Sequence, residues 1–252
     1  IDGYHTSHLI KTSMTNLGGS DMGAATNRAT TFLVIAHCIV KDNKIIEEWL
    51  VRDNYALAEE LGFDVHQVAR EKAAIPIQQR LKDWNQSELN RVQKSVTHER
   101  QPFLGCSSND SEGFIEALLQ NIWNARLLGD VFQSYSNDAL LHCSRNQTLK
   151  GREEIAAFYA QIIGTVTQLK FSHDYCCSRP NDNGGQDVAV RWTITGNHGG
   201  AGLYGEPTGA PLLILGESQF RIIDGLIAEE WTIFDELSIL VQIYRARLNI
   251  AD

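Results

Sequence analysis

Apolar and polar residues follow the same alternation in two distant stretches of the chain. Residues 41–53 read KDNKIIEEWLVRD, and residues 223–235 read IDGLIAEEWTIFD. Their tryptophans and their final aspartates are each 182 positions apart (231 − 49 and 235 − 53). Upstream, residues 11–15 align with residues 191–195 at an offset of 180. A repeat of this length indicates a duplicated domain, because the units of a solenoid are much shorter.

Each copy is predicted to form a β-hairpin followed by a helix. In the second copy, apolar residues at 212–215 and 220–223 lead into Asp224-Gly225, which is a strong signal for a type I′ turn. The first copy has Asp42-Asn43 in the same place. A helix is expected at 54–61, where Gly62 is a suitable residue to end it, and another at 236–244.

The residues before the second hairpin predict further elements. Apolar residues recur at helical spacing over 114–123, with Asp110 or Ser111 available as the N-cap, and a second helix starts near Gly151. Short strands are expected at 138–142, 171–175 and 187–195. Helices that gather on one face of an antiparallel sheet form an α+β domain.

Several motifs of the second copy, taken in order, resemble a known family. They are Trp123-Asn124 with the residues up to His142, the 151–158 segment GREEIAAF, the 192–200 segment WTITGNHGG, Pro207-Thr208-Gly209, and the 224–235 repeat. This arrangement resembles the SnoaL-like polyketide cyclases of the nuclear transport factor 2-like superfamily over nearly all of 112–245. The resemblance implies a cone-shaped, cystatin-like α+β fold with a curved antiparallel sheet. It also implies chemistry without metal or organic cofactor.

The first copy resembles only the C-terminal half of such a domain. We therefore divide the chain into an incomplete first copy (1–64), a helical connector (65–108) and a complete second copy (109–252). The helices that should roof the first sheet are missing, so we expect that the sequence lacks the true N-terminus of a tandem protein. The alternative is that the connector helices lie across the open cone.

Composition limits the function without choosing it. Acidic residues (31) outnumber lysine and arginine (22) for a net charge of −9, and no basic cluster occurs, which argues against a nucleic-acid or membrane partner. No apolar run approaches membrane-spanning length. Five cysteines without metal-ligand spacing favour a reducing cytoplasm. Phosphate-loop, zinc-protease and nucleophile-elbow motifs are absent from the sequence, so the function must be argued from the cone.

The turn at Asp224-Gly225 predicts which strand residues face the cone. Counting outward from the turn places Ser218 opposite Trp231. The predicted inner residues are Phe220, Ile222, Ile227, Trp231, Ile233 and Asp235, and in the first copy Cys38, Val40, Ile45, Trp49, Val51 and Asp53. A β-bulge would reverse this assignment.

Two aspartates are the candidate acid/base residues. A carboxylate in an apolar pocket tends to have a raised pKa, which suits proton transfer at neutral pH. The resemblance implies that Asp235, and Asp53 in the incomplete copy, carry the acid/base role of an aldol-type ring closure. The alternative is that each aspartate caps the helix that follows it.

Other polar and aromatic residues complete the predicted site. His198 precedes a glycine-rich loop, and His37 and Gln219 occupy matching positions in the two copies. The register count places His37 and Gln219 on the outer face, where they lie either at an interface or, if a bulge intervenes, in the pocket. The expected substrate-binding residues are Trp49, Trp123, His142, Tyr159, Phe220 and Trp231.

The sequence thus predicts a cofactor-independent cyclase, isomerase or hydratase-type enzyme acting on a small apolar carbonyl compound. The alternative is a non-catalytic binding or assembly module, because one fold hosts many functions. Epoxide hydrolysis would need an Asp-Arg-Asp arrangement that the sequence does not reveal. We expect the two sheets to pack together through their second faces, and we expect a homodimer, because apolar surface must be covered. The apolar residues of the second faces are Ile35, Ile39, Ile46, Leu50, Leu215 and Phe234.

Overall fold

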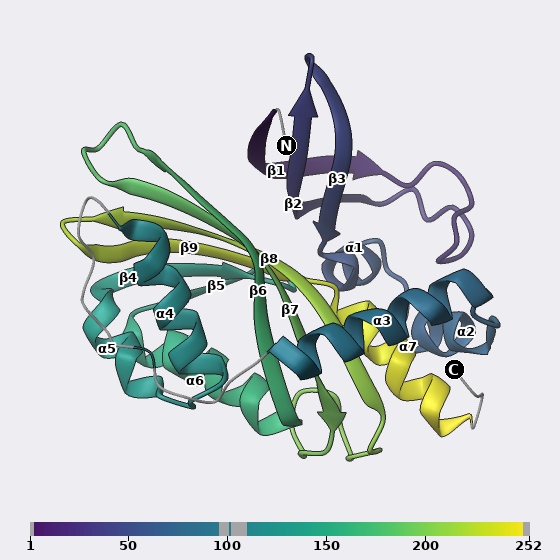
Figure 1. The fold of residues 1–252 in the computed structure, drawn as a ribbon. Coiled ribbons are helices and arrows are strands. Elements are labelled where there is room, and N and C mark those ends of the chain that lie inside the picture. The colour runs from purple at the N-terminus through teal and green to yellow at the C-terminus, as the bar shows by residue number, and fades with distance from the viewer. Residues whose placement is uncertain (1–2, 96–100, 102–109, 249–252) are drawn as a thin grey trace.

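The computed structural model describes residues 3–95, 101 and 110–248 (Figure 1). The N-terminal part is a three-stranded antiparallel sheet of β1 (Tyr4–Thr15), β2 (Ala29–Lys41) and β3 (Lys44–Arg52), with β2 in the centre, followed by helix α1 (Asn54–Glu60). Asp42 and Asn43 both have positive φ angles, as the predicted tight turn between β2 and β3 requires.

The connector forms two helices, α2 (Val65–Ala74) and α3 (Gln79–Ser95). Asp64 caps α2 by accepting hydrogen bonds from the backbone N–H groups of His66 and Gln67. Helix α2 packs against the C-terminal helix, and α3 packs against strands β6 to β8, as Figure 1 shows. The connector therefore does not roof the N-terminal sheet. Its predicted end, including Cys106, lies outside the described residues.

The C-terminal part contains one six-stranded sheet in the order β5-β4-β9-β8-β7-β6. Its elements are α4 (Ser111–Trp123), the 3₁₀ turn η1 (Leu128–Asp130), α5 (Val131–Ser134), β4 (Tyr135–Cys143), β5 (Gln147–Lys150), α6 (Arg152–Thr165), β6 (Val166–Pro180), β7 (Gln186–His198), β8 (Pro211–Ile223), β9 (Leu226–Phe234) and α7 (Glu236–Arg247). Helices α4 to α6 lie together on one side of the sheet (Figure 1). The predicted α+β cone is confirmed, with the addition that β4 and β9 pair in parallel.

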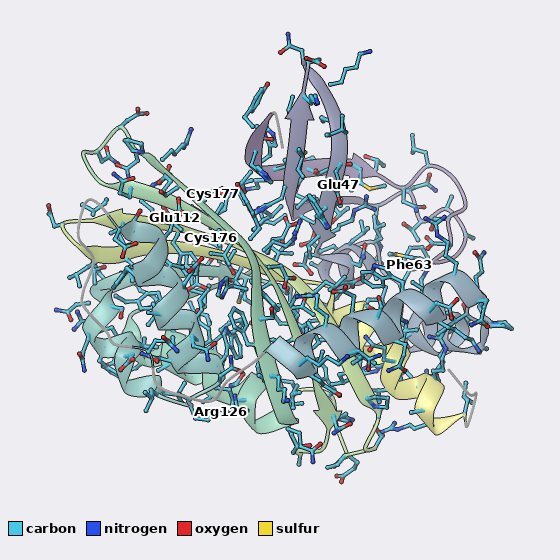
Figure 2. All side chains as sticks on the ribbon, viewed as in Figure 1. Glu47, Phe63, Glu112, Arg126, Cys176 and Cys177 are labelled. Atoms are coloured by element: carbon cyan, nitrogen blue, oxygen red, sulfur yellow. The ribbon has the colours of Figure 1, made fainter. Side chains whose placement is uncertain are left out.

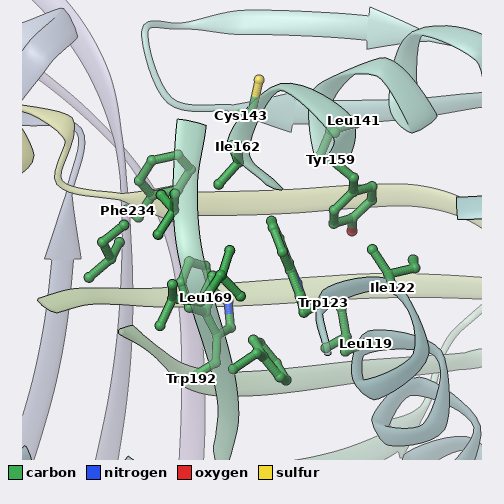
Figure 3. Close-up of a cluster of buried hydrophobic side chains, with 14 of the residues drawn as sticks. Leu119, Ile122, Trp123, Leu141, Cys143, Tyr159, Ile162, Leu169, Trp192 and Phe234 are labelled. Carbon is green, nitrogen blue, oxygen red and sulfur yellow. The ribbon is translucent and has the colours of Figure 1, made fainter. Parts of the chain in front are cut away.

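Aromatic side chains fill the space between these helices and the sheet. Trp123 of α4 stacks on Phe171 with ring centroids 6.2 Å apart. It also contacts Tyr159 edge-on at 5.0 Å, as Figure 3 shows. Trp192 of β7 lies 6.5 Å from Trp123 and 6.1 Å from Phe234. All five rings are buried. Such large, interlocked apolar side chains supply much of the free energy of folding of the cone.

A β-bulge in the last hairpin changes the predicted faces. Ile222 opposes Ile227 as expected, but Arg221 then pairs with Glu229, so that Gln219 opposes Trp231. Beyond the bulge, Glu230, Thr232 and Phe234 point into the cone, whereas Trp231 and Ile233 point outward. The prediction that Trp231 and Ile233 share the inner face with Phe220, Ile222 and Ile227 is therefore wrong. One extra residue between ladder pairs reverses every later side chain.

The first hairpin contains the same irregularity. Val40 pairs with Ile45, and the next residue, Ile39, pairs with Glu47, which skips one position on β3. Trp49 and Val51 consequently share a face with His37 and Ile35. Their predicted placement beside Cys38, Val40 and Ile45 is wrong for the same physical reason.

The outer faces of the two sheets pack against each other. Ile35, Val51 and Ile233 form a buried cluster between them. At its margins, Arg191 lies 3.6 Å from the ring centroid of Trp49, His5 stacks on Tyr175 at 4.0 Å, and Gln219 donates a hydrogen bond of 2.6 Å to Ser7. Sheet-to-sheet packing, as predicted from the sequence, is therefore observed.

The apolar residues expected at this interface divide into two groups. Ile35 and Ile39 are buried as predicted. Ile46, Leu50 and Leu215 are 56, 45 and 40 % exposed, and Phe234 faces the cone interior, so their placement in the interface is wrong. On the other face of the N-terminal sheet, α1 covers Phe32 and Val34.

Two titratable side chains are buried between the sheets without hydrogen-bond partners. Glu217 of β8 has neither carboxyl oxygen bonded, and Nε2 of His37 is also unbonded. Burial raises the pKa of Glu217 to about 9, although the charge of Arg191 opposes the shift, and burial lowers the pKa of His37 to about 4. Each group is therefore neutral in the folded protein near pH 7.

Glu217→Gln is expected to stabilise the protein more strongly as the pH rises. The folded pKa of Glu217 lies above its unfolded value of 4.5, so its contribution to stability is complete below pH 4.5 and is lost as pH rises toward 9. Glutamine cannot ionise, so the stability of the variant does not fall over this pH range through ionisation at position 217. Urea denaturation should show that the free energy of unfolding gained by the variant is roughly 1–3 kcal/mol larger at pH 8.5 than at pH 6.

Glu206→Gln, which changes an exposed carboxylate, is the matched control and should alter the free energy of unfolding little at either pH. Equal effects of Glu217→Gln at both pH values would show that Glu217 is ionised in the folded protein.

Candidate functional site

The cone interior holds a carboxyl group that receives three hydroxyl hydrogen bonds. Glu230 of β9 is fully buried. Tyr135 donates to its Oε2 at 2.6 Å, and Tyr159 and Thr232 donate to its Oε1, Tyr159 at 2.9 Å. Burial raises the pKa of Glu230, and these three donors oppose that shift. The carboxyl group is thus held in a fixed position by strands β4 and β9 and helix α6.

The hydrogen bonds continue from Glu230 across the sheet. The hydroxyl groups of Thr232 and Ser218 are 2.7 Å apart, and Nε1 of Trp192 donates to Ser218 Oγ at 2.9 Å. The register explains why these groups meet, because Ser218 pairs with Thr232 and lies on the inner face. Residue spacing did not predict Glu230 and Thr232 as inner residues, because the bulge that turns them inward gives no reliable signal in the sequence. Ser218 lies on the inner face of β8 as the turn count implied, but it was not predicted as a site residue.

A cleft of about 950 Å³ lies outside the cone, where the three parts of the chain meet. Its lining includes Met14, Leu50, Arg52 and Asn54 from the N-terminal part, Lys72, Ile75, Leu81 and Trp84 from the connector, and Leu213, Leu215, Asp235, Leu237, Val241, Gln242 and Arg245 from β8 and α7. The cleft therefore exists only because the N-terminal sheet, the connector and α7 pack around it.

Exposed apolar side chains are concentrated in this cleft. Among the described residues, 13 large apolar side chains are exposed, and six of them border the cleft. These six are Met14, Leu50, Ile75, Leu81, Trp84 and Leu215. A concave surface where apolar side chains gather around a few polar groups is typical of a small-molecule site.

Asp235 borders the cleft and also caps a helix. Its Oδ1 accepts a hydrogen bond of 3.2 Å from the backbone N–H of Ser238 in the first turn of α7. Its Oδ2 accepts one of 2.8 Å from the side-chain amide of Asn54. Burial raises the pKa of Asp235, while the hydrogen bonds from Asn54 and Ser238 act against that shift. The helix-cap alternative for Asp235 is therefore observed, whereas its predicted place inside the cone is wrong, because the bulge in β9 turns this residue outward to the cleft.

Asp53 occupies the corresponding position in the N-terminal part. It is fully buried and caps α1 through a hydrogen bond of 3.1 Å from the backbone N–H of Ala56. Its second oxygen accepts from the backbone N–H of Asn146 at 3.1 Å. Burial raises the pKa of Asp53 to about 6. Both aspartates cap a helix, but only Asp235 borders the cleft.

The predicted histidines and glutamine lie apart from one another. His198 is buried at the end of β7, with Nδ1 3.1 Å from Thr208 Oγ1 and Nε2 unbonded, and burial lowers its pKa. His142 contacts Thr148 and Glu229 on the outer side and stacks on Trp231. His37 and Gln219 lie in the interface between the sheets.

The predicted aromatic residues are divided in the same way. Trp123, Tyr159 and Phe220 are buried in the core of the cone, near the Glu230 network, whereas Trp49 and Trp231 lie at the interface of the sheets. Of all the residues predicted for the site, Asp235 alone borders the cleft within the described part of the chain.

Within the residues that the structure describes, no cluster of three metal-ligating side chains occurs. The described helices include none that is long and apolar enough to span a membrane. Cys176 and Cys177 lie next to each other on β6, near Glu112 of α4 (Figure 2). Burial raises the pKa of both thiols, and the charge of Glu112 adds to the effect, which makes them poor nucleophiles.

Tyr135→Phe is expected to destabilise the protein by about 1–3 kcal/mol, because it removes a hydroxyl donor from the buried Glu230 carboxyl group. Urea denaturation measures the change. Tyr175→Phe is the control, since that ring is half-buried at the sheet interface and keeps its stacking on His5 without the hydroxyl. If the two variants lose equal stability, the network does not stabilise the cone.

Comparison with known proteins shows the family of the chain. No curated protein matches the sequence significantly. Among solved structures, a protein from Jannaschia sp. CCS1 assigned as a SnoaL-like polyketide cyclase shares 17 % identity and covers 56 % of this chain and 98 % of its own, with a TM-score of 0.46. IdmH from Streptomyces antibioticus, assigned as a polyketide cyclase, shares 20 % identity over 53 % of this chain and 98 % of its own, with a TM-score of 0.45.

A protein from Catenulispora acidiphila with a ketosteroid isomerase-like fold, solved in complex with trimethylamine, shares 13 % identity. It covers 48 % of this chain and 85 % of its own, with a TM-score of 0.39. The model of the SnoaL-like polyketide cyclase family matches residues 115–243, just over half of the 252 residues. The chain therefore belongs to the SnoaL-like polyketide cyclase family.

Proposed function

We propose that the chain is a cofactor-independent acid/base enzyme of the cyclase, isomerase or hydratase type. Its substrate is a small apolar carbonyl compound, and the reaction takes place in the cleft between the N-terminal sheet, the connector and α7. The observation that carries this proposal is the position of Asp235, a carboxyl group with a raised pKa at the edge of an apolar cleft of about 950 Å³. The volume suits a compound of drug-like size.

The chemistry follows from the contacts of Asp235. Its carboxylate removes a proton from the carbon next to the substrate carbonyl, and the electron pair of the C–H bond moves onto the carbonyl oxygen to form an enolate. The enolate then attacks a second carbonyl carbon, whose oxygen takes the proton from Asp235, or it takes that proton back at another position. A raised pKa makes the carboxylate of Asp235 a stronger base than that of an exposed aspartate.

Asn54 and Ser238 act as positioning residues in this scheme. Each donates a hydrogen bond to a different oxygen of Asp235, so the carboxyl group cannot rotate freely. Asn54 belongs to the N-terminal part and Asp235 to the C-terminal part, so the acid/base group is complete only when the two parts pack together. A fixed reactive group lowers the entropic cost of reaching the transition state.

Other predicted residues receive less support. Catalytic roles for His198, Gln219, His37 and Asp53 rest on the resemblance and on position in the sequence, since none of these side chains borders the cleft. The same holds for substrate contacts of the aromatic residues and His142, and those roles stay predictions.

A non-catalytic binding or assembly module is the second candidate. It is favoured by the cone itself, whose interior is filled by aromatic rings and by a Glu230 carboxyl group that already has three donors. In that case Asp235 serves as a helix cap, and the cleft binds a ligand without changing it. The homodimer and the cytoplasmic location inferred from the sequence also stay predictions. Light scattering over a wide concentration range tests the former.

Asp235→Asn is expected to lower the rate of proton exchange about 10²- to 10⁴-fold, because asparagine cannot carry the proton. Incubation of apolar 1,3-dicarbonyl compounds with the protein in D₂O, followed by NMR, measures loss of the α-proton signal without knowledge of the natural substrate. Asparagine caps helices about as well as aspartate, so the stability should change little.

Asp64→Asn is the matched control, because Asp64 caps α2 in the same way but does not border the cleft. Its exchange rate should equal that of the unchanged protein. Full activity of Asp235→Asn would reject the catalytic role and leave Asp235 as a cap.

A further inference from the structure

Arg52 presents a positive charge to the cleft without an ionic partner. It is the last residue of β3 and precedes Asp53. Its side chain is exposed, borders the cleft and lies 6.0 Å from the ring centroid of Phe32. Among the described residues, no carboxylate forms an ion pair with its guanidinium group. An exposed arginine beside an apolar surface can form two parallel hydrogen bonds to an incoming anion.

The other two cations of the cleft are already engaged. Lys72 forms an ion pair with Asp21. The guanidinium group of Arg245 donates to the backbone carbonyls of Lys72, Ala73 and Ile75 at 3.2–3.3 Å and thereby satisfies the end of α2. Arg52 forms no salt bridge among the described residues, although its charge contributes to the lowered pKa of Asp21, so its guanidinium group can still donate hydrogen bonds to a ligand.

The charge balance of the cleft differs from that of the whole chain. Its lining carries three cations (Arg52, Lys72 and Arg245) and two acidic residues (Asp21 and Asp235), whereas the protein carries a net charge of −9. Asp21 is held by Lys72, whose hydrogen bond is the main cause of its lowered pKa. A local excess of positive charge in an acidic protein favours anions at this one place.

The same cleft offers apolar contacts from a different element. Leu81 and Trp84 lie on successive turns of α3 and are 49 and 43 % exposed, and Leu215 of β8 is 40 % exposed. Together with the connector residue Ile75, they provide a surface on which an apolar body can replace water. A ligand that uses both kinds of contact must combine an apolar body with a charged group.

We infer that the cleft recognises apolar molecules that carry one carboxylate or similar anionic group, and that Arg52 binds that group. The inference shares its site with the proposed enzymatic function and narrows the substrate class to anionic carbonyl compounds. It does not depend on Asp235 acting as a base, because recognition of the anion requires only Arg52 and the apolar wall.

Paired fluorescent probes test the inference. The aromatic sulfonate 1-anilinonaphthalene-8-sulfonate and the neutral N-phenyl-1-naphthylamine have the same apolar rings and differ in charge. Arg52→Gln should weaken binding of the sulfonate about tenfold, the range expected for loss of a charge-assisted hydrogen bond, and change binding of the neutral probe less than about twofold. Added salt should weaken sulfonate binding to the unchanged protein more than to the variant.

Two further variants serve as controls for the probe measurements. Arg179→Gln removes an exposed arginine that pairs with Asp187 on the outer side of the sheet and should leave both affinities unchanged. Trp84→Ala should weaken both probes, because it removes part of the apolar wall. Circular dichroism confirms that each variant is folded.

Equal weakening of both probes by Arg52→Gln, or no effect on either, would overturn the assignment of Arg52 as the anion-binding residue. The enzymatic proposal fails separately. It is rejected if Asp235→Asn exchanges protons at the full rate while Arg52→Gln still weakens only the sulfonate probe. If Arg52→Gln affects both probes equally and Asp235→Asn strongly slows proton exchange, the enzymatic function is supported and the anionic substrate is rejected.

Discussion

The packing of the two outer sheet faces is the contact on which the rest of the molecule depends. Ile35, Val51 and Ile233 meet there in a small buried cluster. This contact sets α1 beside α7, so that Asn54 reaches Asp235 across the boundary between the two parts. Since the cleft is lined from both parts and from the connector, it would not exist without this packing. The burial of these apolar side chains thus supports the contact between Asn54 and Asp235.

The alternation of the sequence predicted the α+β class and the two hairpins, because these depend on local spacing, and the helix caps at Asp53 and Asp235 were the alternative to their catalytic role. It did not predict which strand face turns inward. Each hairpin has one skipped residue in its ladder. In the second hairpin this turns Trp231 outward and places the carboxyl group of Glu230 in the core. Bulges depend on contacts across the sheet, so periodicity along a single strand cannot reveal them. The cleft was equally inaccessible to prediction, because its lining comes from segments that meet only after the tertiary fold has formed.

Four buried or partly buried carboxyl groups show how surroundings decide what one chemical group can do. Glu230 has three hydroxyl donors and is a fixed part of the core. Glu217 has none, so it stays protonated and lowers the stability of the sheet interface as the pH rises. Asp53 is closed off by backbone N–H groups. Asp235 alone combines hydrogen bonds that fix its position with access to an apolar cleft.

These differences distinguish the core of the cone from the junction of the parts. Inside the cone, Trp123, Phe171 and Trp192 pack against one another, and exposing them would cost the free energy gained by their burial. At the junction, apolar side chains of α3 and β8 remain exposed in the folded protein, so a ligand that covers them gains free energy without unpacking the core. A ligand of the proposed kind would contact the N-terminal sheet, the connector and α7 at once, so its binding and the packing of these parts would stabilise each other.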